Sequence, residues 1–291
     1  MEKSLRTDLA AEARDLWQKG RNMTLPGLVT ERQQHQGFMV DLVEIQTEEA
    51  AKELCKPKGR YVTVELDALI RREEDAFPRG CDVLAQELRR QLQLEPWNSV
   101  LVVGLGNPDI TPDALGPLAA DHVLVTRHLR ERLGEDFAGL RPVSVFRSGV
   151  LGTTGVESAE LTAAVAERIR PDRIIAVDAL AALQVSRLCK AVQISDTGIV
   201  PGSGVGNARS ALTAETLGAP VIVVGVPTVV DAATLCADLT GGEPPAEAKD
   251  MFVTPRNIDS RVRDVARLVG YAIDLALQED MSLEEVEMYL G

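Results

Sequence analysis

Hydrophobic and polar residues are arranged differently in the two parts of the chain. Residues 1–98 contain long polar runs around two segments in which apolar and polar residues alternate, GFMVDLVEI and GRYVTVEL. Such alternation is typical of strands with one buried face, so we expect two strands that are antiparallel or lie at a sheet edge. An amphipathic pattern from about Cys81 to Leu94 predicts a helix after them.

From Ser99 onwards, continuous apolar runs alternate with helical patterns. The runs are SVLVVGLG, RPVSVF, RIIAVDAL, AVQIS and PVIVVGV. Parallel strands that are covered on both faces have this character. Helices are predicted over residues 112–133, 156–169, about 178–189 and 211–217. These elements predict an α/β core with a doubly wound, mostly parallel sheet, to which the N-terminal strands form a small β-rich attachment.

The end of the chain is predicted to be helical. Apolar residues recur at three- and four-residue spacing between Ile258 and Ile273, which favours one long amphipathic helix. Ser282 and Glu285 form a capping-box pattern that predicts the start of a last helix.

Composition narrows the classes of function. The 291 residues are 45% hydrophobic but only 3% aromatic, so the core should be aliphatic. The formal net charge of -13, with no visible basic patch, argues against direct binding of nucleic acid. Four scattered cysteines and the absence of an apolar signal run favour a reduced cytosolic compartment. No apolar run reaches the roughly 18 residues of a membrane span, so no membrane partner is expected.

The stretch VVGLGNPDITPDALG, residues 102–116, combines glycines after a strand with an acid near a helix start. Gly104 and Gly106 match the first two glycines of a dinucleotide fingerprint, but Asp109 occupies the position of the third. A carboxylate there repels a pyrophosphate, and Pro108 removes one N–H donor. The sequence therefore predicts no nucleotide cofactor.

Asp113 and Asp178 are the acids that most suggest chemistry. Thr111 as N-cap and Pro112 as first helical residue place Asp113 in a first turn, where the helix dipole should lower its pKa. Asp178 directly follows an apolar strand, and the carboxyl ends of parallel strands meet at one edge. We therefore expect both acids in one crevice, although an acid in a first turn is more often structural.

Asp196 and Asp231 also follow strands. For these two we expect structural hydrogen-bond acceptors rather than catalytic groups.

Two glycine-rich stretches are predicted at the same edge. GVLGTTG and PGSGVGN allow a backbone to approach a peptide or an oxyanion closely, and equally they are consistent with tight turns. Their candidate substrate-binding or site-shaping residues are Gly152, Thr153, Gly202, Ser203 and Gly204.

Other hydrolase classes have weak support. The residues around Ser203 do not form the G-x-S-x-G nucleophile elbow, and a triad would need His35, His122 or His128. No H-E-x-x-H or C-x-x-C motif occurs, so no metal site is predicted, although carboxylates alone remain an alternative for a hard ion.

Longer motifs resemble a known family. LRTDLAAEA, KGRYVTVEL, VVGLGN, TPDALGP, GVLGTTGVE, ISDTGIVPGSGVGN and ETLGAPVIVVGVPTVVDA occur in order, and the likeness extends from residue 5 to about residue 278. They are similar to the germination protease of spore-forming bacteria, the endopeptidase that degrades small acid-soluble spore proteins. The resemblance implies a phosphorylase/hydrolase-like fold, shared with the hydrogenase-maturation endopeptidases. It also assigns the family's two essential aspartates to Asp113 and Asp178, with Gly104, Gly106 and Asn107 shaping the turn.

The same resemblance implies a zymogen that removes its own N-terminus. TDLA, residues 7–10, has the form of a cleavage site, with cleavage between Asp8 and Leu9. The expected organisation is a propeptide over 1–8, strands and helix over 9–98 packed on the core, and a catalytic α/β core over 99–291. The resemblance further implies a homotetramer in the spore-core cytoplasm.

The expected mechanism is hydrolysis by an unlike carboxylate pair, with Asp113 as the base. Two alternatives remain open: a maturation peptidase that depends on a carboxylate-bound metal, and a non-catalytic binding protein on the same fold.

Overall fold

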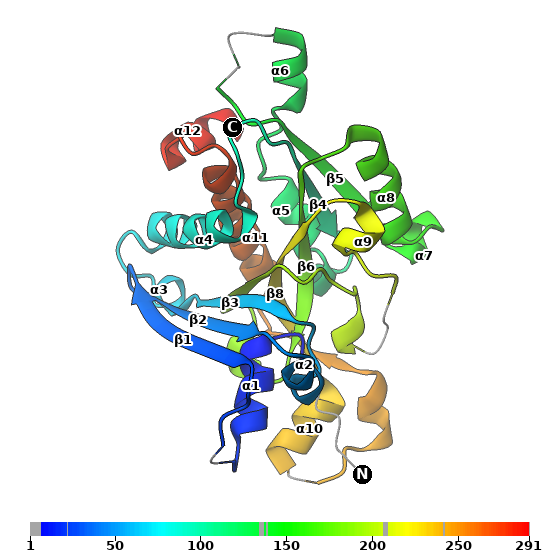
Figure 1. The fold of residues 1–291 in the computed structure, drawn as a ribbon. Helices are drawn as coiled ribbons and strands as arrows, with labels where there is room; N and C mark the ends of the chain where they lie inside the picture. The colour runs from blue at the N-terminus through cyan, green and yellow to red at the C-terminus, as the bar shows by residue number, and fades with distance from the viewer. Residues whose placement is uncertain are drawn as a thin grey trace.

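One mixed sheet organises the molecule. The computed structural model describes residues 7–21, 23–133, 137, 139–205, 209–240 and 242–290. Within them, nine strands pair in the order β1-β2-β3-β7-β8-β6-β4-β5, and β9 pairs with β8 (Figure 1). The strands are β1 (Leu28–His35), β2 (Phe38–Ile45), β3 (Gly59–Glu65), β4 (Val100–Leu105), β5 (Val143–Gly149), β6 (Arg173–Ala182), β7 (Ala191–Ser195), β8 (Val221–Asp231) and β9 (Phe252–Val253).

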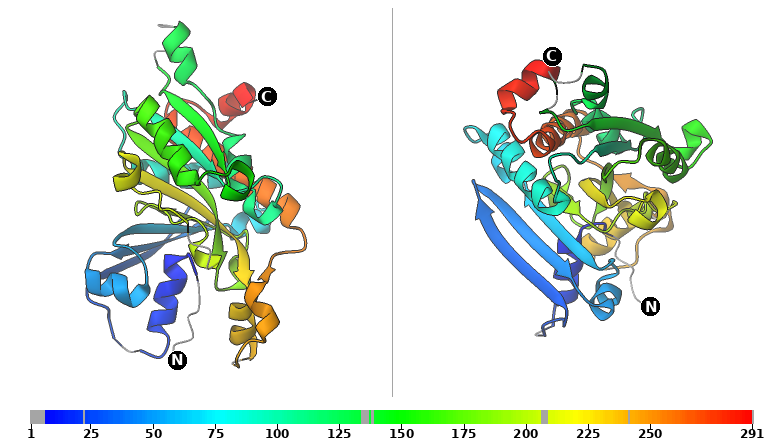
Figure 2. Two further views of the ribbon diagram at one scale, coloured as in Figure 1. Left: turned by 90° about the vertical axis from the view of Figure 1, so that its right-hand side faces the viewer. Right: turned by 45° about the horizontal axis from the view of Figure 1, so that its top comes forward.

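Strand direction divides the sheet into two parts. Strand β2 pairs antiparallel with β1 on one side and with β3 on the other, and the antiparallel pair β2–β3 is formed by the two alternating segments, as predicted. Parallel pairing joins β5 to β4, β4 to β6 and β6 to β8. The antiparallel group lies at one end of the sheet and β5 at the other (Figure 2).

The prediction of a mostly parallel sheet holds only for the strands β5, β4, β6 and β8. The AVQIS run forms β7, which is antiparallel both to β3 and to β8, so its assignment as a parallel strand was wrong. The connection from β6 to β7 holds only a 3-10 turn, η3 (Val185–Arg187). A parallel partner would need a longer crossover, usually a helix. Strand β7 also joins the N-terminal strands to the core in one continuous sheet.

Helices cover both faces of the core strands. Alternate residues of β4 pack into different clusters: Val100 and Val102 on one face, Leu101 and Val103 on the other. The first face is covered by α4 (Ala76–Leu92), α5 (Leu115–Ala120) and α11 (Ile258–Leu277). The second is covered by α8 (Ser158–Ile169) and α9 (Ala214–Leu217) over the parallel strands, and by α1 (Ala10–Gln18) and α2 (Glu48–Leu54) over the antiparallel ones.

The remaining elements lie mainly at the ends of strands. They are α3 (Asp67–Ile70), α6 (Arg127–Leu133), α7 (Leu151–Thr154), α10 (Ala232–Thr240), α12 (Leu283–Leu290), η1 (Thr111–Asp113), η4 (Ser203–Val205) and η5 (Ala246–Asp250). Within the described part of the chain, no helix combines the length and apolar character that crossing a bilayer requires.

Some predicted helices are confirmed and others are wrong. The helices predicted near residues 81–94, 156–169 and 258–273 correspond to α4, α8 and α11. The capping box is confirmed, because Ser282 N–H donates to Glu285 Oε2 at 2.7 Å and Glu285 N–H donates to Ser282 Oγ at 3.2 Å. The helix predicted over 112–133 is divided into η1, α5 and α6, and that over 211–217 shortens to α9.

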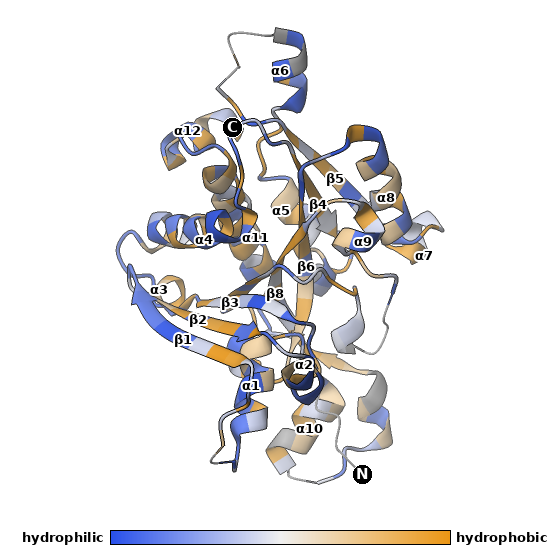
Figure 3. Cartoon of the chain, in the orientation of Figure 1, coloured by the Kyte–Doolittle hydropathy of each residue, from blue (hydrophilic) through white to orange (hydrophobic). Residues whose placement is uncertain are grey.

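The helix predicted over residues 178–189 is replaced by strand. Strand β6 continues to Ala182, because residues 179–182 pair with β8. The alanine-rich run has helical propensity, but the neighbouring strand supplies hydrogen bonds that override it. Strand β1 was not predicted at all. Its side chains are largely exposed, and Figure 3 colours most of β1 as hydrophilic, so its apolar signal is weak.

Candidate active site

A cavity of about 710 Å³ lies at the carboxyl ends of the parallel strands and brings both predicted acids together. Asp113 reaches it from η1 and Asp178 from β6. Asp178 is 5% exposed, and it lies inside β6 rather than at the start of a helix as predicted. The crevice predicted from strand ends therefore exists and contains both carboxyl groups.

The turn after β4 positions Asp113. Its Oδ2 accepts a hydrogen bond of 2.8 Å from Asn107 N–H. Gly106 has φ of +110°, and a Cβ there would overlap the backbone oxygen of Asp113. A side chain at residue 106 would therefore displace the acid. The glycine that allows close helix packing is Gly116 in α5, where a Cβ would overlap the backbone oxygens of Leu105 and Val177.

The predicted capping of Asp113 was wrong. Ile110 is the N-cap residue and makes no side-chain capping bond, whereas Thr111 Oγ1 donates to Asp259 Oδ1 at 2.7 Å. The expected lowering of the Asp113 pKa is also wrong: burial raises that pKa, and the Asn107 N–H only partly opposes the shift. The single 3-10 turn has little dipole to offset the lost hydration.

Asp178 is the harder of the two acids to ionise. Burial raises the pKa of Asp178 well above its usual range, and the nearby charges of Asp113 and Asp8 raise it further. One backbone hydrogen bond, 2.9 Å from Ala179 N–H to Asp178 Oδ1, favours the ionised form. The protonated state is thus favoured at Asp178 over Asp113.

The N-terminal segment of the chain lies in this cavity. Asp8 is among the residues that line it; its N–H donates to Ala181 O at 2.9 Å, and Ala181 N–H donates back to Asp8 Oδ2 at 2.8 Å. Ser203 Oγ also donates to Asp8 Oδ1 at 3.2 Å. Leu9 is fully buried among Leu180, Ala182, Leu188 and Val230. The predicted propeptide therefore ends inside the cavity; its residues 1–6 lie outside the described residues.

The glycine-rich stretches lie where they were predicted. Gly152 and Thr153, from α7, Gly202, just before η4, and Gly204, within η4, line the cavity. Ser203 is not among the residues that line the cavity, but its hydroxyl group donates a hydrogen bond to Asp8. Residues 206–208 of the PGSGVGN run lie outside the described residues. Gly104 is not a lining residue: a Cβ there would meet Gly116 O at 2.5 Å, so it serves the packing of α5.

The other two strand-end acids each accept a hydrogen bond from a backbone N–H, in line with the structural role expected for them. Asp196 Oδ1 accepts from Arg60 N–H at 2.7 Å, and Asp231 Oδ1 accepts from Thr234 N–H at 2.7 Å. Across the described residues, no group of three or more His, Cys, Asp or Glu side chains is arranged to hold a metal ion.

Three residues that line the cavity or contact the N-terminal segment were missed in the sequence. Thr228 lines the cavity, and its buried Oγ1 has no hydrogen-bond partner among the described residues. Lys56 donates to Thr7 O at 2.7 Å, and burial lowers the pKa of its ammonium group. Gln193 binds the N-terminal segment from β7. Each lies in an ordinary strand or loop pattern, so only the fold reveals these contacts.

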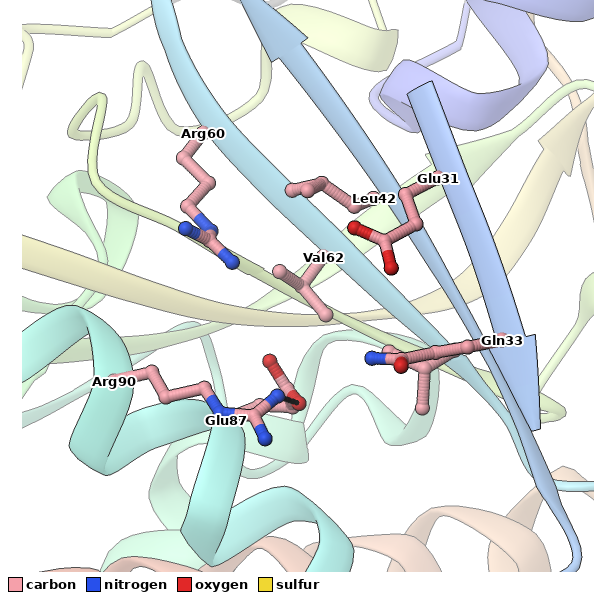
Figure 4. A pocket seen from close by; sticks show the side chains of 8 residues that line it. Glu31, Gln33, Leu42, Arg60, Val62, Glu87 and Arg90 are labelled. Atoms are coloured by element: carbon pink, nitrogen blue, oxygen red, sulfur yellow. Dashed lines mark hydrogen bonds and ion pairs between the residues drawn. The ribbon is translucent and has the colours of Figure 1, made fainter. Parts of the chain in front are cut away.

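A second cavity on the opposite face of the sheet is far smaller. It measures about 20 Å³ and lies between β1, β2, β3 and α4, where Figure 4 shows Glu31, Arg60 and Glu87 among its side chains. Arg90 forms an ion pair with Glu87. This space suits a single water molecule rather than a peptide.

The comparisons with known proteins agree on one family. The family model described as germination protease matches residues 6–241. The chain belongs to the germination protease family. The germination protease of Caldanaerobacter subterraneus subsp. tengcongensis is 38% identical over 98% of this chain and 98% of its own length. The one from Clostridium perfringens is 36% identical over 99% of both chains, and the one from Priestia megaterium is 46% identical over 81% of this chain and 66% of its own. Membership identifies the chain as a protease and therefore a hydrolase.

Proposed function

We propose that this protein is an endopeptidase that starts the degradation of small acid-soluble spore proteins during germination, cutting after an acidic residue. The observation that carries the proposal is the position of Asp8, whose carboxylate and backbone are bound in the cavity of Asp113 and Asp178. A peptide with an acid at the residue before the cut would take the same place. The proposal includes the phosphorylase/hydrolase-like fold, a homotetrameric assembly and a location in the spore core.

The recognition of an acidic residue has a direct physical basis in this proposal. Ala181 N–H and Ser203 Oγ both donate to the Asp8 carboxylate. Hydrogen bonds to a charged acceptor are stronger than bonds between neutral groups. An amide in place of the carboxylate would lose that charge, so peptides with Asn or Gln at this position should be poor substrates.

The proposed chemistry uses the two acids in different protonation states. Asp113 is ionised and takes a proton from water, whose oxygen attacks the carbonyl carbon. Asp178 is protonated and gives its proton to the leaving nitrogen, so the products are a new carboxyl group and a new amine. The stronger upward shift of the Asp178 pKa supports this division of roles.

Self-processing follows from the same arrangement. We propose that the chain cuts its own bond between Asp8 and Leu9, which removes residues 1–8. Until that cut, Asp8 occupies the position of a substrate residue, so the uncut chain should be inhibited.

The test is incubation of the purified full chain with a peptide that contains a Thr-Glu-Ile-Ala site, followed by mass spectrometry. Cleavage after Glu, together with loss of residues 1–8 from the chain itself, is the expected result. Asp178→Asn should abolish both reactions. Cleavage elsewhere, or normal cleavage by a folded Asp178→Asn variant, would contradict the proposal.

The same assay separates the alternatives. Activity that survives treatment with a chelator argues against a carboxylate-bound metal, whereas activity that a chelator removes and a divalent ion restores supports the metal-dependent peptidase. A chain that binds the peptide but never cuts it would be the non-catalytic binding protein.

A further inference from the structure

Gln193 contacts both sides of the bond proposed for cleavage. Its Nε2 donates to Asp8 O at 3.2 Å, and its Oε1 accepts from Ala10 N–H at 2.8 Å. The bond between Asp8 and Leu9 lies between these two contacts. We propose that Gln193 is a catalytic residue, an inference that rests on the proposed function. It binds the carbonyl oxygen of the bond that is cut and the backbone N–H of the second residue after the cut.

The sheet places Gln193 opposite Asp178. Gln193 in β7 pairs with Gly225 in β8, and Gly225 pairs on its other side with Asp178 in β6. Residues paired across neighbouring strands direct their side chains to the same face of a sheet. The carboxamide and the carboxyl group therefore project from the same face, from strands about 10 Å apart.

The residue between them, Gly225, makes room for the side chain of Leu180. Gly225 has no side chain, and a Cβ there would overlap the side chain of Leu180, which covers it. Asp8 crosses this region, because its backbone and carboxylate are bound to Ala181 in β6 while its carbonyl oxygen is bound to Gln193 in β7. Asp8 is thus held by β6 and β7, the two strands that flank β8.

The chemistry of a carboxamide suits both contacts at once. Glutamine carries a donor and an acceptor, whereas a carboxylate has no donor. When water attacks the carbonyl carbon, negative charge develops on the oxygen to which Nε2 donates, and a buried donor stabilises that charge. Gln193 is only 6% exposed. It keeps its own protons throughout: water gives a proton to Asp113, and Asp178 gives one to the leaving nitrogen.

Gln193 recognises backbone atoms alone. The contact with Ala10 N–H requires a hydrogen on the second residue after the cut, whatever its side chain. After self-processing, a substrate must place its own residues where Leu9 and Ala10 now lie.

The first test compares two buried glutamines. Gln278 is 4% exposed, and its carboxamide likewise accepts from a backbone N–H and donates to a backbone oxygen, those of Arg141, at 2.8 and 3.1 Å. It follows α11 and bonds to Arg141, which precedes β5, so it lies at the amino end of the parallel strands, whereas the cavity lies at their carboxyl ends. Gln278→Ala therefore makes the same truncation outside the site.

We expect Gln193→Ala and Gln193→Glu to lower kcat for peptide cleavage about 100-fold, with a smaller change in KM. Loss of residues 1–8 should slow by a similar factor. Gln278→Ala should lower the unfolding temperature but leave kcat/KM within about twofold of the unmodified protein. A folded Gln193→Ala variant with kcat within about threefold of the unmodified protein would overturn the inference.

The second test changes the substrate instead. In a peptide whose amide between the first and second residues after the cut is replaced by an ester, the N–H that Gln193 accepts from is absent. The unmodified protein should cut this peptide about tenfold more slowly, while Gln193→Ala should show no further loss. An ester placed well beyond the bound residues is the control. Equal loss in both proteins would contradict the proposed contact.

The two proposals fail in different ways. If the unmodified chain cuts neither itself nor the peptide, both are wrong. The other outcome has three parts: the unmodified chain cuts after the acid, Asp178→Asn is inactive, and Gln193→Ala cuts normally. In that case only the proposed role of Gln193 is wrong.

Discussion

Asp178 and Asp274 are both buried carboxyl groups, but they lie in different surroundings. Asp178 is 5% exposed in β6, and Asp274 is 1% exposed in α11. Burial raises the pKa of each, to about 8 for Asp274. Each accepts one backbone hydrogen bond, from Ala179 and from Leu124 N–H, both at 2.9 Å.

The difference lies in what surrounds the two acids. Asp178 shares a cavity with Asp113 and Asp8, whereas Asp274 sits in the packing of α11, and its Oδ2 has no hydrogen-bond partner among the described residues. Burial alone makes a carboxyl group hard to ionise. A second acid and space for a peptide are what would make such a group useful in hydrolysis.

The largest expected effect is on peptide cleavage. Asp178→Asn should reduce kcat about 1,000-fold, because an amide cannot give a proton to the leaving nitrogen. Asp274→Asn should leave kcat unchanged, because its remaining oxygen still accepts from Leu124 N–H. Equal losses in the two folded variants would mean that burial, and not the cavity, determines their importance.

The next effect is on stability and concerns Asp274. Its folded-state pKa lies above the unfolded value, so the folded protein binds the proton more tightly. The stabilisation is complete below about pH 4 and is lost as the pH rises towards 8, by on the order of 5 kcal/mol from this group alone. Urea unfolding at several pH values measures it.

Asp274→Asn is the control for that measurement. Without a titrating group, the variant should lose the corresponding fall in the free energy of unfolding between pH 4 and pH 9. An identical pH dependence in both proteins would show that folding does not raise the pKa of Asp274.

A smaller effect is expected in the pH dependence of cleavage. Both site pKa values are raised, so the window in which Asp113 is ionised and Asp178 is protonated should lie above the usual carboxyl range. On each side of that window kcat/KM should fall about tenfold per pH unit. The profile of Asp274→Asn should coincide with it, and a profile centred below pH 4 would argue against the pair.

The smallest effect concerns the hydroxyl group that binds Asp8. Ser203→Ala removes one hydrogen bond to the Asp8 carboxylate, at an exposed residue. We expect self-cleavage to slow about three- to tenfold. Gel electrophoresis over time measures the rate, and Ser282→Ala, outside the cavity, should show no change.

Part of the site could be predicted from local sequence. The parallel core strands and the glycine turn each show a recognisable pattern in consecutive residues. Asp178 could be singled out because it follows an apolar run. Asp113 was found for a partly wrong reason. It lies near an element start, but burial rather than a helix dipole governs its pKa.

Gln193 shows where local sequence stops being informative. It is one polar residue in the apolar run AVQIS, and its partner Ala10 is 183 positions away. A polar residue in a buried strand can have many structural roles, and no residue near it in the sequence identifies its hydrogen-bond partner. The antiparallel placement of β7 brings it beside Gly225 and the N-terminal segment.

The sequence by itself therefore determined the aliphatic α/β core, the two acids and the Thr-Asp-Leu-Ala segment, because these depend on periodicity and short motifs. Only the tertiary structure decided the direction of β7, the extension of β6 beyond Asp178 and the position of Asp8 in the cavity. Those features arise from pairing between distant strands and from burial. Neither leaves a periodic signal in neighbouring residues.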